Sequence, residues 1–215
     1  MYQFLPQAVI YPLHQQDVEL VLSLAAQPQY KQVTFSARGG GTGTNGQSLT
    51  HGLILDVSRH LNQVLEINAE EGWARVQAGV VKDALNDALR PHGFFFSPDL
   101  STSNRATVGG MVNTDASGAG SLVYGKTSDH VLGITSVLID GSVLTTTPID
   151  QDKLAEQPFG DNSLGNSIAS QIAEVCRVKR DTIIERFPKL NRFLTGYDLK
   201  HVWNDDLSQF DLSRI

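Results

Sequence analysis

A glycine-rich run directly after an apolar stretch constrains this chain more than any other feature. Residues 38–46, here called the glycine loop, read Arg-Gly-Gly-Gly-Thr-Gly-Thr-Asn-Gly. They follow residues 33–37, a β-prone segment. Glycine adopts positive φ and lets the backbone approach a ligand with no Cβ in the way. Because consecutive N–H groups in such a loop form a concave anion site, the run predicts a phosphate-binding loop, and a pyrophosphate in particular.

The composition is that of an ordinary globular protein. The chain has 215 residues, of which 40% are hydrophobic and 19% are charged. Its formal net charge of −6 argues against non-specific binding to nucleic acid. The sequence holds no apolar run long enough to predict a membrane span. With no secretory signal in the first residues, we expect a cytoplasmic protein, with peripheral attachment to a membrane as the alternative.

Cysteine usage limits the chemistry further. The single cysteine, Cys176, excludes an internal disulfide framework and a cysteine-rich zinc or iron–sulfur site within this chain. It lies in a run with helical periodicity, so we expect a buried structural thiol. The sequence indicates no metal ligands.

The hydrophobic pattern predicts a mixture of helices and strands. We expect helices at 17–26 and 80–90 and from Asn162 onward, and strands at 33–37, 53–57, 64–67, 73–78, 94–96, 133–140 and 143–147. The polar stretch at 97–130 is long enough to be a functional loop. This mixture favours an α+β fold over a regularly alternating parallel sheet.

Two other phosphate-binding motifs fit the glycine loop less well. No Gly-Lys-Ser/Thr follows at the spacing that a Walker loop requires. Gly41, Gly43 and Gly46 satisfy the Rossmann spacing, and Glu66 stands where a ribose-binding acid is expected. That motif must open a helix, however, and the next expected element is the strand at 53–57. A glycine-rich turn without a ligand is the remaining alternative.

Several motifs in a fixed order resemble a known family. The glycine loop is followed by Pro-Asp at 98–99, Thr-Val-Gly-Gly at 107–110, Tyr-Gly at 124–125 and Val-Leu-Gly at 131–133. This order resembles the PCMH-type FAD-binding domain shared by vanillyl-alcohol oxidase, D-lactate dehydrogenase and glycolate oxidase. The resemblance covers roughly residues 6–150.

The resemblance implies a division of the chain into three parts. Residues 1–60 would form a first subdomain with the pyrophosphate loop, and residues 61–150 a second subdomain that completes the FAD site. Residues 151–215 would be a helical extension. The resemblance also implies a set of cofactor-binding residues: Arg38, Gly39, Gly40, Gly41, Thr42, Gly43, Thr44, Pro98, Asp99, Ser101, Thr102, Thr107, Gly109, Gly110, Asn113, Asp115, Ser117, Gly118 and Val131. Because Thr42 stands where some relatives attach flavin to a histidine, the FAD should be non-covalent.

One branch of the family is the most similar. Many relatives have Asn-Ala-Gly-Gly where this chain has Asp-Ala-Ser-Gly at 115–118, which puts the usual contact of the asparagine in question. The segments at 113–133 and 190–199 resemble the large bacterial flavoproteins of the D-2-hydroxyglutarate dehydrogenase type, which carry a fused iron–sulfur segment. We therefore expect this chain to be a truncated piece, inactive alone, with the iron–sulfur cluster in the missing part.

The resemblance implies the FAD-binding portion of an oxidoreductase. Its substrate would be a D-2-hydroxy acid of the 2-hydroxyglutarate or lactate type, oxidised by hydride transfer to FAD. The alternative is a non-catalytic binding or assembly module with a degenerate flavin site. His130 and Lys126 lie in the expected loop, but we expect a structural histidine and a surface lysine, so no catalytic residue is assigned. The electron acceptor is not indicated, and a homo-oligomer is expected.

Overall fold

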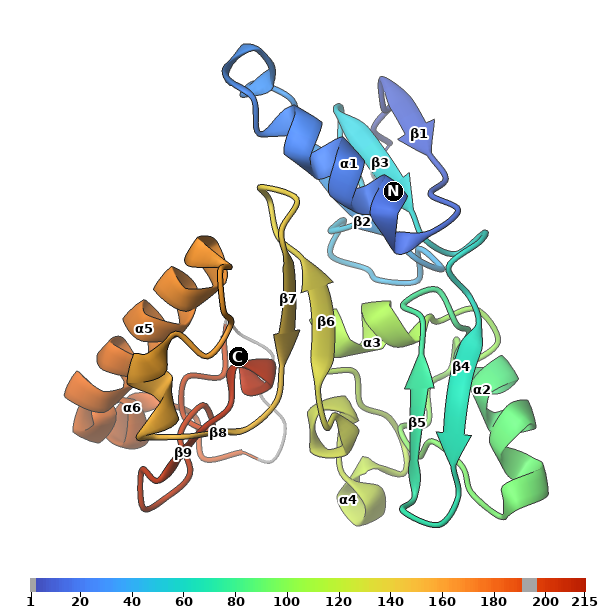
Figure 1. Cartoon of the computed structure of the whole chain (residues 1–215). Coiled ribbons are helices and arrows are strands. Elements are labelled where there is room, and N and C mark those ends of the chain that lie inside the picture. The colour runs from blue at the N-terminus through green and yellow to red at the C-terminus, as the bar shows by residue number, and fades with distance from the viewer. Residues whose placement is uncertain (1–2, 191–196) are drawn as a thin grey trace. The chain divides into compact units, whose positions relative to one another are not determined.

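The structure is a computed structural model that describes residues 3–190 and 197–215 (Figure 1). It divides into two compact units, Met1–His130 and Val131–Ile215. Part of the motif at 190–199 lies outside the described residues. The finer division expected at residues 60 and 150 stays a prediction.

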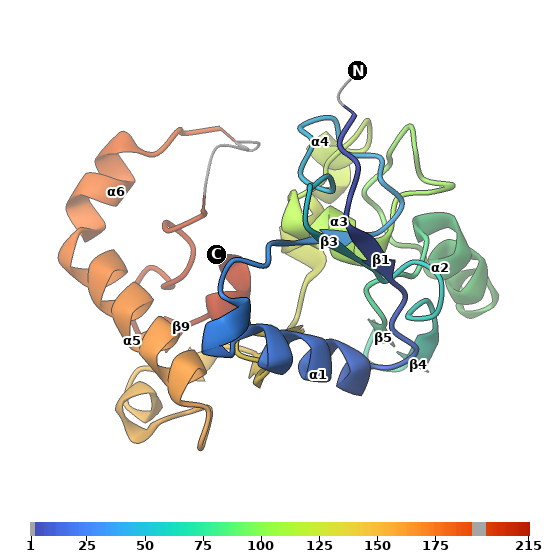
Figure 2. The ribbon, with the colours of Figure 1, turned by 90° about the horizontal axis from the view of Figure 1, so that it is seen from above.

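The first unit begins with a parallel sheet of three strands. The strands are β1 (Ala8–Ile10), β2 (Phe35–Arg38) and β3 (Leu53–Asp56), in the order β1-β3-β2. The central strand β3 places Ile54 and Leu55 in the interior. Helix α1 (Gln15–Ala25) lies along one face of this sheet, as Figure 2 also shows. The carboxylate of Asp17 fixes the start of α1 by accepting the N–H groups of Leu13 and His14 at 2.8 and 3.1 Å. The helix predicted at 17–26 and the strands predicted at 33–37 and 53–57 are confirmed.

A hairpin and a helix complete the interior of the first unit. Strands β4 (Val64–Asn68) and β5 (Trp73–Val76) pair antiparallel, and α2 (Lys82–Leu89) follows. The buried side chains of Val80, Leu85 and Leu89 pack against the apolar face of the hairpin. The alternating pattern of the hairpin and the 3.6-residue spacing of the helix predicted these elements correctly.

The segment from 90 to 130 differs from the expectation. The strand predicted at 94–96 is wrong: the N–H of Phe96 donates to the Asn86 side chain at 2.7 Å instead of to a neighbouring strand. The expected loop contains helices α3 (Val108–Asn113) and α4 (Ser121–Tyr124) and the 3₁₀ turn η3 (Thr127–His130). Each is too short for a hydrophobic period to reveal it in the sequence.

The second unit combines a hairpin with two helices. The strands predicted at 133–140 and 143–147 are confirmed as β6 (Ile134–Val137) and β7 (Val143–Thr146), which pair as a hairpin. The predicted helical region is confirmed as α5 (Ser163–Val178) and α6 (Arg180–Arg186). A short antiparallel pair, β8 (Ile149–Asp150) with β9 (Gln209–Phe210), joins distant parts of this unit. The remaining 3₁₀ turns that the structure describes are Pro28–Tyr30 and Arg90–His92 in the first unit, and Lys153–Glu156 and Leu212–Arg214 in the second.

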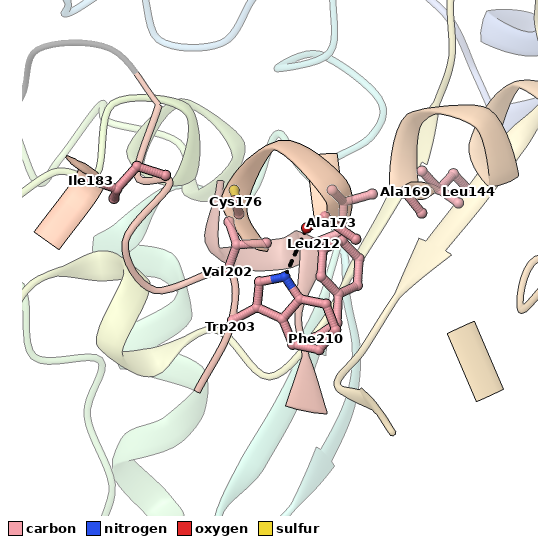
Figure 3. Close-up of a cluster of buried hydrophobic side chains, with 9 residues drawn as sticks. All are labelled: Leu144, Ala169, Ala173, Cys176, Ile183, Val202, Trp203, Phe210 and Leu212. Atoms are coloured by element: carbon pink, nitrogen blue, oxygen red, sulfur yellow. Dashed lines mark hydrogen bonds between the residues drawn. The ribbon is translucent and has the colours of Figure 1, made fainter. Parts of the chain in front are cut away.

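The second unit has a dense apolar core, shown in Figure 3. Phe210 is fully buried beside Trp203, with ring centroids 5.3 Å apart. The indole N–H of Trp203 donates to the carbonyl of Ala173 at 3.1 Å, so this buried polar group is satisfied. Cys176 is buried in the same cluster, as predicted, and this burial raises the pKa of its thiol.

Three turns of the second unit share an Asp-x-Ser pattern. In each, one aspartate oxygen accepts both the N–H and the hydroxyl of the serine two residues later; the pairs are Asp140 with Ser142, Asp206 with Ser208, and Asp211 with Ser213. The serine hydroxyl is the main cause that lowers the pKa of Asp140 and of Asp206. In these turns, the hydrogen bonds of the aspartate and serine side chains are therefore made within the chain.

Candidate cofactor-binding site

The glycine loop leaves a row of backbone donors open. Strand β2 ends at Arg38, and the N–H groups of residues 39–45 donate to no acceptor in the described part of the chain. Gly41 has a φ of 63°, which favours glycine. The next regular element is strand β3, which confirms that the loop does not open a Rossmann helix. Such a row of free N–H groups is suited to bind an anion.

The start of the loop packs tightly against the second predicted cluster. A Cβ on Gly39 would lie 2.0 Å from the hydroxyl oxygen of Thr107, and one on Gly40 would lie 1.9 Å from the carbonyl oxygen of Arg105. Real Cβ atoms do not approach this closely, so both positions require glycine. The fold thus brings together two segments that are far apart in the sequence and that were both predicted to bind the cofactor.

The next glycines of the loop lie against the ends of long, flexible side chains instead. A Cβ on Gly41 would meet the guanidinium of Arg38 at 2.4 Å, and one on Gly43 would meet the Gln47 amide at 2.0 Å. Among the described residues, Arg38 has no acidic partner. Thr42 is half-buried and Thr44 is exposed. A guanidinium beside free N–H groups adds positive charge where an anion would bind.

A second close approach joins residues 98–99 to residues 117–118. A Cβ on Gly118 would lie only 1.3 Å from the carbonyl oxygen of Asp99, so the two backbones are in direct contact. Pro98 is fully buried next to this contact. Ser101 and Thr102 lie in the turn that follows, with Ser101 exposed and Thr102 half-buried.

Helix α3 holds the next group of predicted residues. The N–H of Gly109 donates to the carbonyl of Ala78 at 2.9 Å, and a Cβ on Gly109 would lie 2.7 Å from the Ala78 side chain. Thr107 is buried immediately before the helix, whereas Gly110 and Asn113 are exposed on it. The close approach at Gly109 explains why a glycine stands there.

Ser117 carries a hydrogen-bonding group with no partner. The residue is 9% exposed, and its hydroxyl oxygen is the buried side-chain polar atom without a hydrogen bond in the described part of the chain. A buried polar group left unpaired costs about 1–3 kcal/mol. The orphaned hydroxyl and the open N–H groups fit a ligand rich in phosphate and hydroxyl oxygens, as FAD is.

Asp115 is held by contacts that the sequence did not indicate. Its carboxylate pairs with the ammonium of Lys126 and accepts the N–H of Ser128 at 2.9 Å. Lys126 also donates to the hydroxyl of Ser128 at 2.6 Å. Lys126 was expected on the surface, yet its side chain is only 12% exposed.

His130 also lies within a set of hydrogen bonds. Its Nε2 is 2.8 Å from the hydroxyl of Ser97 and 2.7 Å from the carbonyl oxygen of Tyr124. Because a carbonyl oxygen only accepts, Nε2 carries a proton in this arrangement. The contacts give His130 a structural role in the loop.

Two predictions concern other parts of the chain. Val131 is half-buried at the start of the second unit, and its part in a cofactor site stays a prediction. None of the described helices is both long and apolar enough to cross a bilayer.

Comparisons with known proteins support the predicted family. The FAD binding domain family matches residues 6–147. Over its whole length the chain is 58% identical to D-2-hydroxyglutarate dehydrogenase of Escherichia coli (strain K12), of which it covers 21%. Glycolate oxidase subunit GlcD of Bacillus subtilis (strain 168) is 34% identical over 67% of the chain, which covers 30% of that protein.

Solved structures show the same fold. 6-Hydroxy-D-nicotine oxidase from Arthrobacter nicotinovorans aligns with 67% of this chain, and the chain covers 31% of it, with a TM-score of 0.59 and 24% identity. An alkyldihydroxyacetonephosphate synthase aligns with 63% of the chain, which covers 25% of it, with a TM-score of 0.56 and 25% identity. These likenesses confirm the predicted α+β, PCMH-type fold.

Proposed function

Because this chain belongs to the FAD binding domain family, we propose that it is the FAD-binding portion of a dehydrogenase that oxidises a D-2-hydroxy acid. The observation that carries the proposal is the 58% identity to a D-2-hydroxyglutarate dehydrogenase over the whole chain. The chain spans about a fifth (21%) of the length of that relative, so the activity proposed is that of a larger protein. We propose 2-hydroxyglutarate as the first substrate class and lactate as the second.

The glycine loop would hold the pyrophosphate of FAD. The free N–H groups of residues 39–45 supply donors, and the guanidinium of Arg38 supplies positive charge. Thr42 and Thr44 add hydroxyl donors at the same loop. The FAD would be bound without a covalent bond, because Thr42 carries no suitable nucleophile.

The second cluster would bind the rest of the cofactor. The hydroxyls of Ser101, Thr102 and Ser117 suit ribityl and phosphate oxygens, and the orphaned hydroxyl of Ser117 gains a partner in this way. The backbone at the exposed Gly110 can lie close to a flat ligand because this residue has no side chain, whereas the glycine face of Gly109 is packed against Ala78.

FAD supplies the acceptor for the two electrons removed from the hydroxy acid. A base must also take the proton of the substrate hydroxyl. In the described part of this chain, the Nε2 of His130 and the ammonium of Lys126 are both engaged in hydrogen bonds within the protein. The chain therefore binds and orients the cofactor, and the base and the carboxylate-binding groups are assigned to the rest of the larger protein.

The alternative function, a binding module with a degenerate flavin site, has less support. In a degenerate flavin site, we expect larger residues in place of the glycines, or acceptors within the protein for the N–H groups of the loop. Instead, Gly39 and Gly40 still allow the close backbone contacts, and the N–H groups of residues 39–45 are open.

The test is direct measurement of FAD binding. The protein, expressed from its complete reading frame, should be yellow or become yellow with FAD, and heat or acid denaturation should release free FAD. Turnover of D-2-hydroxyglutarate and D-lactate is then compared with that of their L-enantiomers, using a dye as electron acceptor. A protein that stays colourless in excess FAD would contradict the proposal.

We propose a cytoplasmic location and self-association as secondary features. The lone, buried Cys176 suits a reducing compartment. The exposed apolar side chains of Leu122 (91%) and Val123 (78%) on α4 favour a protein contact. Cell fractionation and light scattering with detection of mass test these two statements, and a monomeric mass contradicts the second.

A further inference from the structure

We propose that the ion pair of Asp115 and Lys126 positions the hydroxyl of Ser117 for the cofactor. The inference rests on the proposed function, and it assigns to Lys126 and Asp115 the role of positioning residues. Neither side chain needs to touch FAD for this role.

Asp115 adopts a backbone conformation that needs support. Its φ is 43°, in the left-handed region, which is uncommon for residues with a side chain and is best tolerated by Asn and Asp. Its carboxylate is held on both oxygens, one by the ammonium of Lys126 and the other by the N–H of Ser128 at 2.9 Å. These bonds fix the turn that sends the chain from α3 toward Ser117.

The next residue is held from the same side. The carbonyl of Ala116 accepts both the N–H of Thr127, at 3.1 Å, and the Thr127 hydroxyl, at 2.6 Å. Thr127 is fully buried. The N–H of Ala116 donates in the opposite direction, to the carbonyl of Met111 at 2.9 Å. The peptide groups before Ser117 therefore have a defined orientation.

The residue after Ser117 is also fixed. Gly118 lies against the carbonyl of Asp99, and its N–H donates to the Ser121 hydroxyl at 2.8 Å. Ser117 thus lies between two segments that cannot rotate freely, and its hydroxyl stays buried and unpaired. An unpaired buried hydroxyl lowers the stability of the protein when no ligand is bound. Because the residues on both sides of Ser117 are ordered, we infer that its hydroxyl is kept in place for a ligand.

Lys126 is better explained by this role than by direct contact with a phosphate. Its ammonium already donates to Asp115 and to the hydroxyl of Ser128, and its own N–H donates to the Asp129 carboxylate at 2.9 Å. With 12% of its side chain exposed, Lys126 is part of the interior of the loop. Its charge is compensated by Asp115.

A double-mutant cycle tests the coupling. Lys126→Met, Ser117→Ala and the double variant are made in the protein expressed from its complete reading frame, and the Kd for FAD is measured by flavin fluorescence. Each single variant should weaken binding by about tenfold, the size of one hydrogen bond. If Lys126 acts through Ser117, the double variant should lose no more than about threefold beyond the larger single loss.

A second readout separates positioning from general damage. Ser117→Ala should raise the melting temperature of the FAD-free protein, because it removes an unpaired buried hydroxyl. The matched control is Lys153→Met, which breaks the exposed ion pair of Lys153 and Asp150, and it should leave the Kd for FAD unchanged. If Lys126→Met does not fold, Asp115→Asn replaces it in the cycle, since asparagine tolerates the same backbone conformation.

The outcomes distinguish this inference from the proposed function. A wild-type protein that binds no FAD contradicts the proposed function. A wild-type protein that binds FAD, with a double variant whose loss exceeds the threefold limit or single variants with unchanged Kd, overturns the positioning role and leaves the proposed function intact.

Discussion

The two compact units differ in what they do with their polar groups. In the second unit, the buried indole N–H of Trp203 has a partner, and none of the described buried side-chain polar atoms lacks one. In the first unit, the described residues leave the N–H groups of residues 39–45 and the Ser117 hydroxyl without acceptors. Packing alone favours the arrangement of the second unit, because a buried polar group left unpaired, such as the Ser117 hydroxyl, costs free energy. The unpaired groups of the first unit are typical of a ligand-binding site.

The largest expected effect lies in the core of the second unit. Phe210→Ala removes a fully buried ring that contacts Trp203, so the free energy of unfolding should fall by about 3–5 kcal/mol. Chemical denaturation, followed by Trp fluorescence, measures the change. The Kd for FAD, measured under conditions where the variant is folded, should change by less than about threefold, the limit for a site with no direct contact. A larger change would remove the contrast between the units.

A smaller but specific effect is expected at the glycine contacts of the first unit. In Gly118→Ala, the new Cβ would overlap the carbonyl oxygen of Asp99, so the backbone must move and FAD affinity should fall by about 100-fold or 2.7 kcal/mol. Isothermal titration calorimetry measures the affinity. The control is Gly72→Ala: Gly72 also has positive φ, at 74°, but has open space around it. It should cost about 1 kcal/mol of stability with no loss of binding.

The stability of the second unit should depend on pH in the alkaline range, through the buried thiol of Cys176. Burial raises the pKa of the Cys176 thiol in the folded state, so the folded protein favours the neutral form. Its contribution to stability is fully present below the unfolded thiol pKa of about 8.5 and is lost as the pH rises from there toward the folded pKa. Urea unfolding from pH 7 to 10 should show a steeper alkaline loss for the wild type than for Cys176→Ala. Parallel curves would contradict this.

The smallest effect is expected at an exposed turn of the second unit. The serine hydroxyl lowers the pKa of Asp140, so this bond stabilises the fold above the unfolded carboxyl pKa of about 3.9 and is lost as the pH falls through the folded value. Ser142→Ala should raise the pKa of Asp140, as NMR titration of its carboxyl carbon can show. Stability at pH 7 should change by less than about 0.5 kcal/mol, because water replaces the bond. An unchanged pKa would contradict the assigned cause.

Local patterns in the sequence predicted the elements that are long or strongly periodic. The glycine loop after a strand, the absence of a helix behind it and the two hairpins follow from neighbouring residues, whose chemistry acts over a few positions. The helical region from Asn162 has a regular apolar stripe, so it was also predicted correctly.

The contacts that the sequence did not indicate depend on distant partners. The side chain of Asn86 accepts the N–H of Phe96, so this N–H is not available to a neighbouring strand and the three phenylalanines do not form one. Asp115 and Lys126 have no motif that joins them, and their pairing exists only because the loop folds back on itself. The same is true of Gly118 and Asp99. Of the two departures from the family pattern, Asp115 is thus held by contacts with Lys126 and Ser128 that a linear pattern cannot contain.

The order of the first sheet has a consequence for synthesis on the ribosome. Strand β3 lies between β1 and β2, and both outer strands form their backbone bonds with it. Because synthesis proceeds at about 5–20 residues per second, β3 emerges from the ribosome seconds after β1. During that time the edge of β1 is open to other chains. We therefore expect the nascent chain to depend on chaperones, or on slow translation after residue 56, more than the finished protein does.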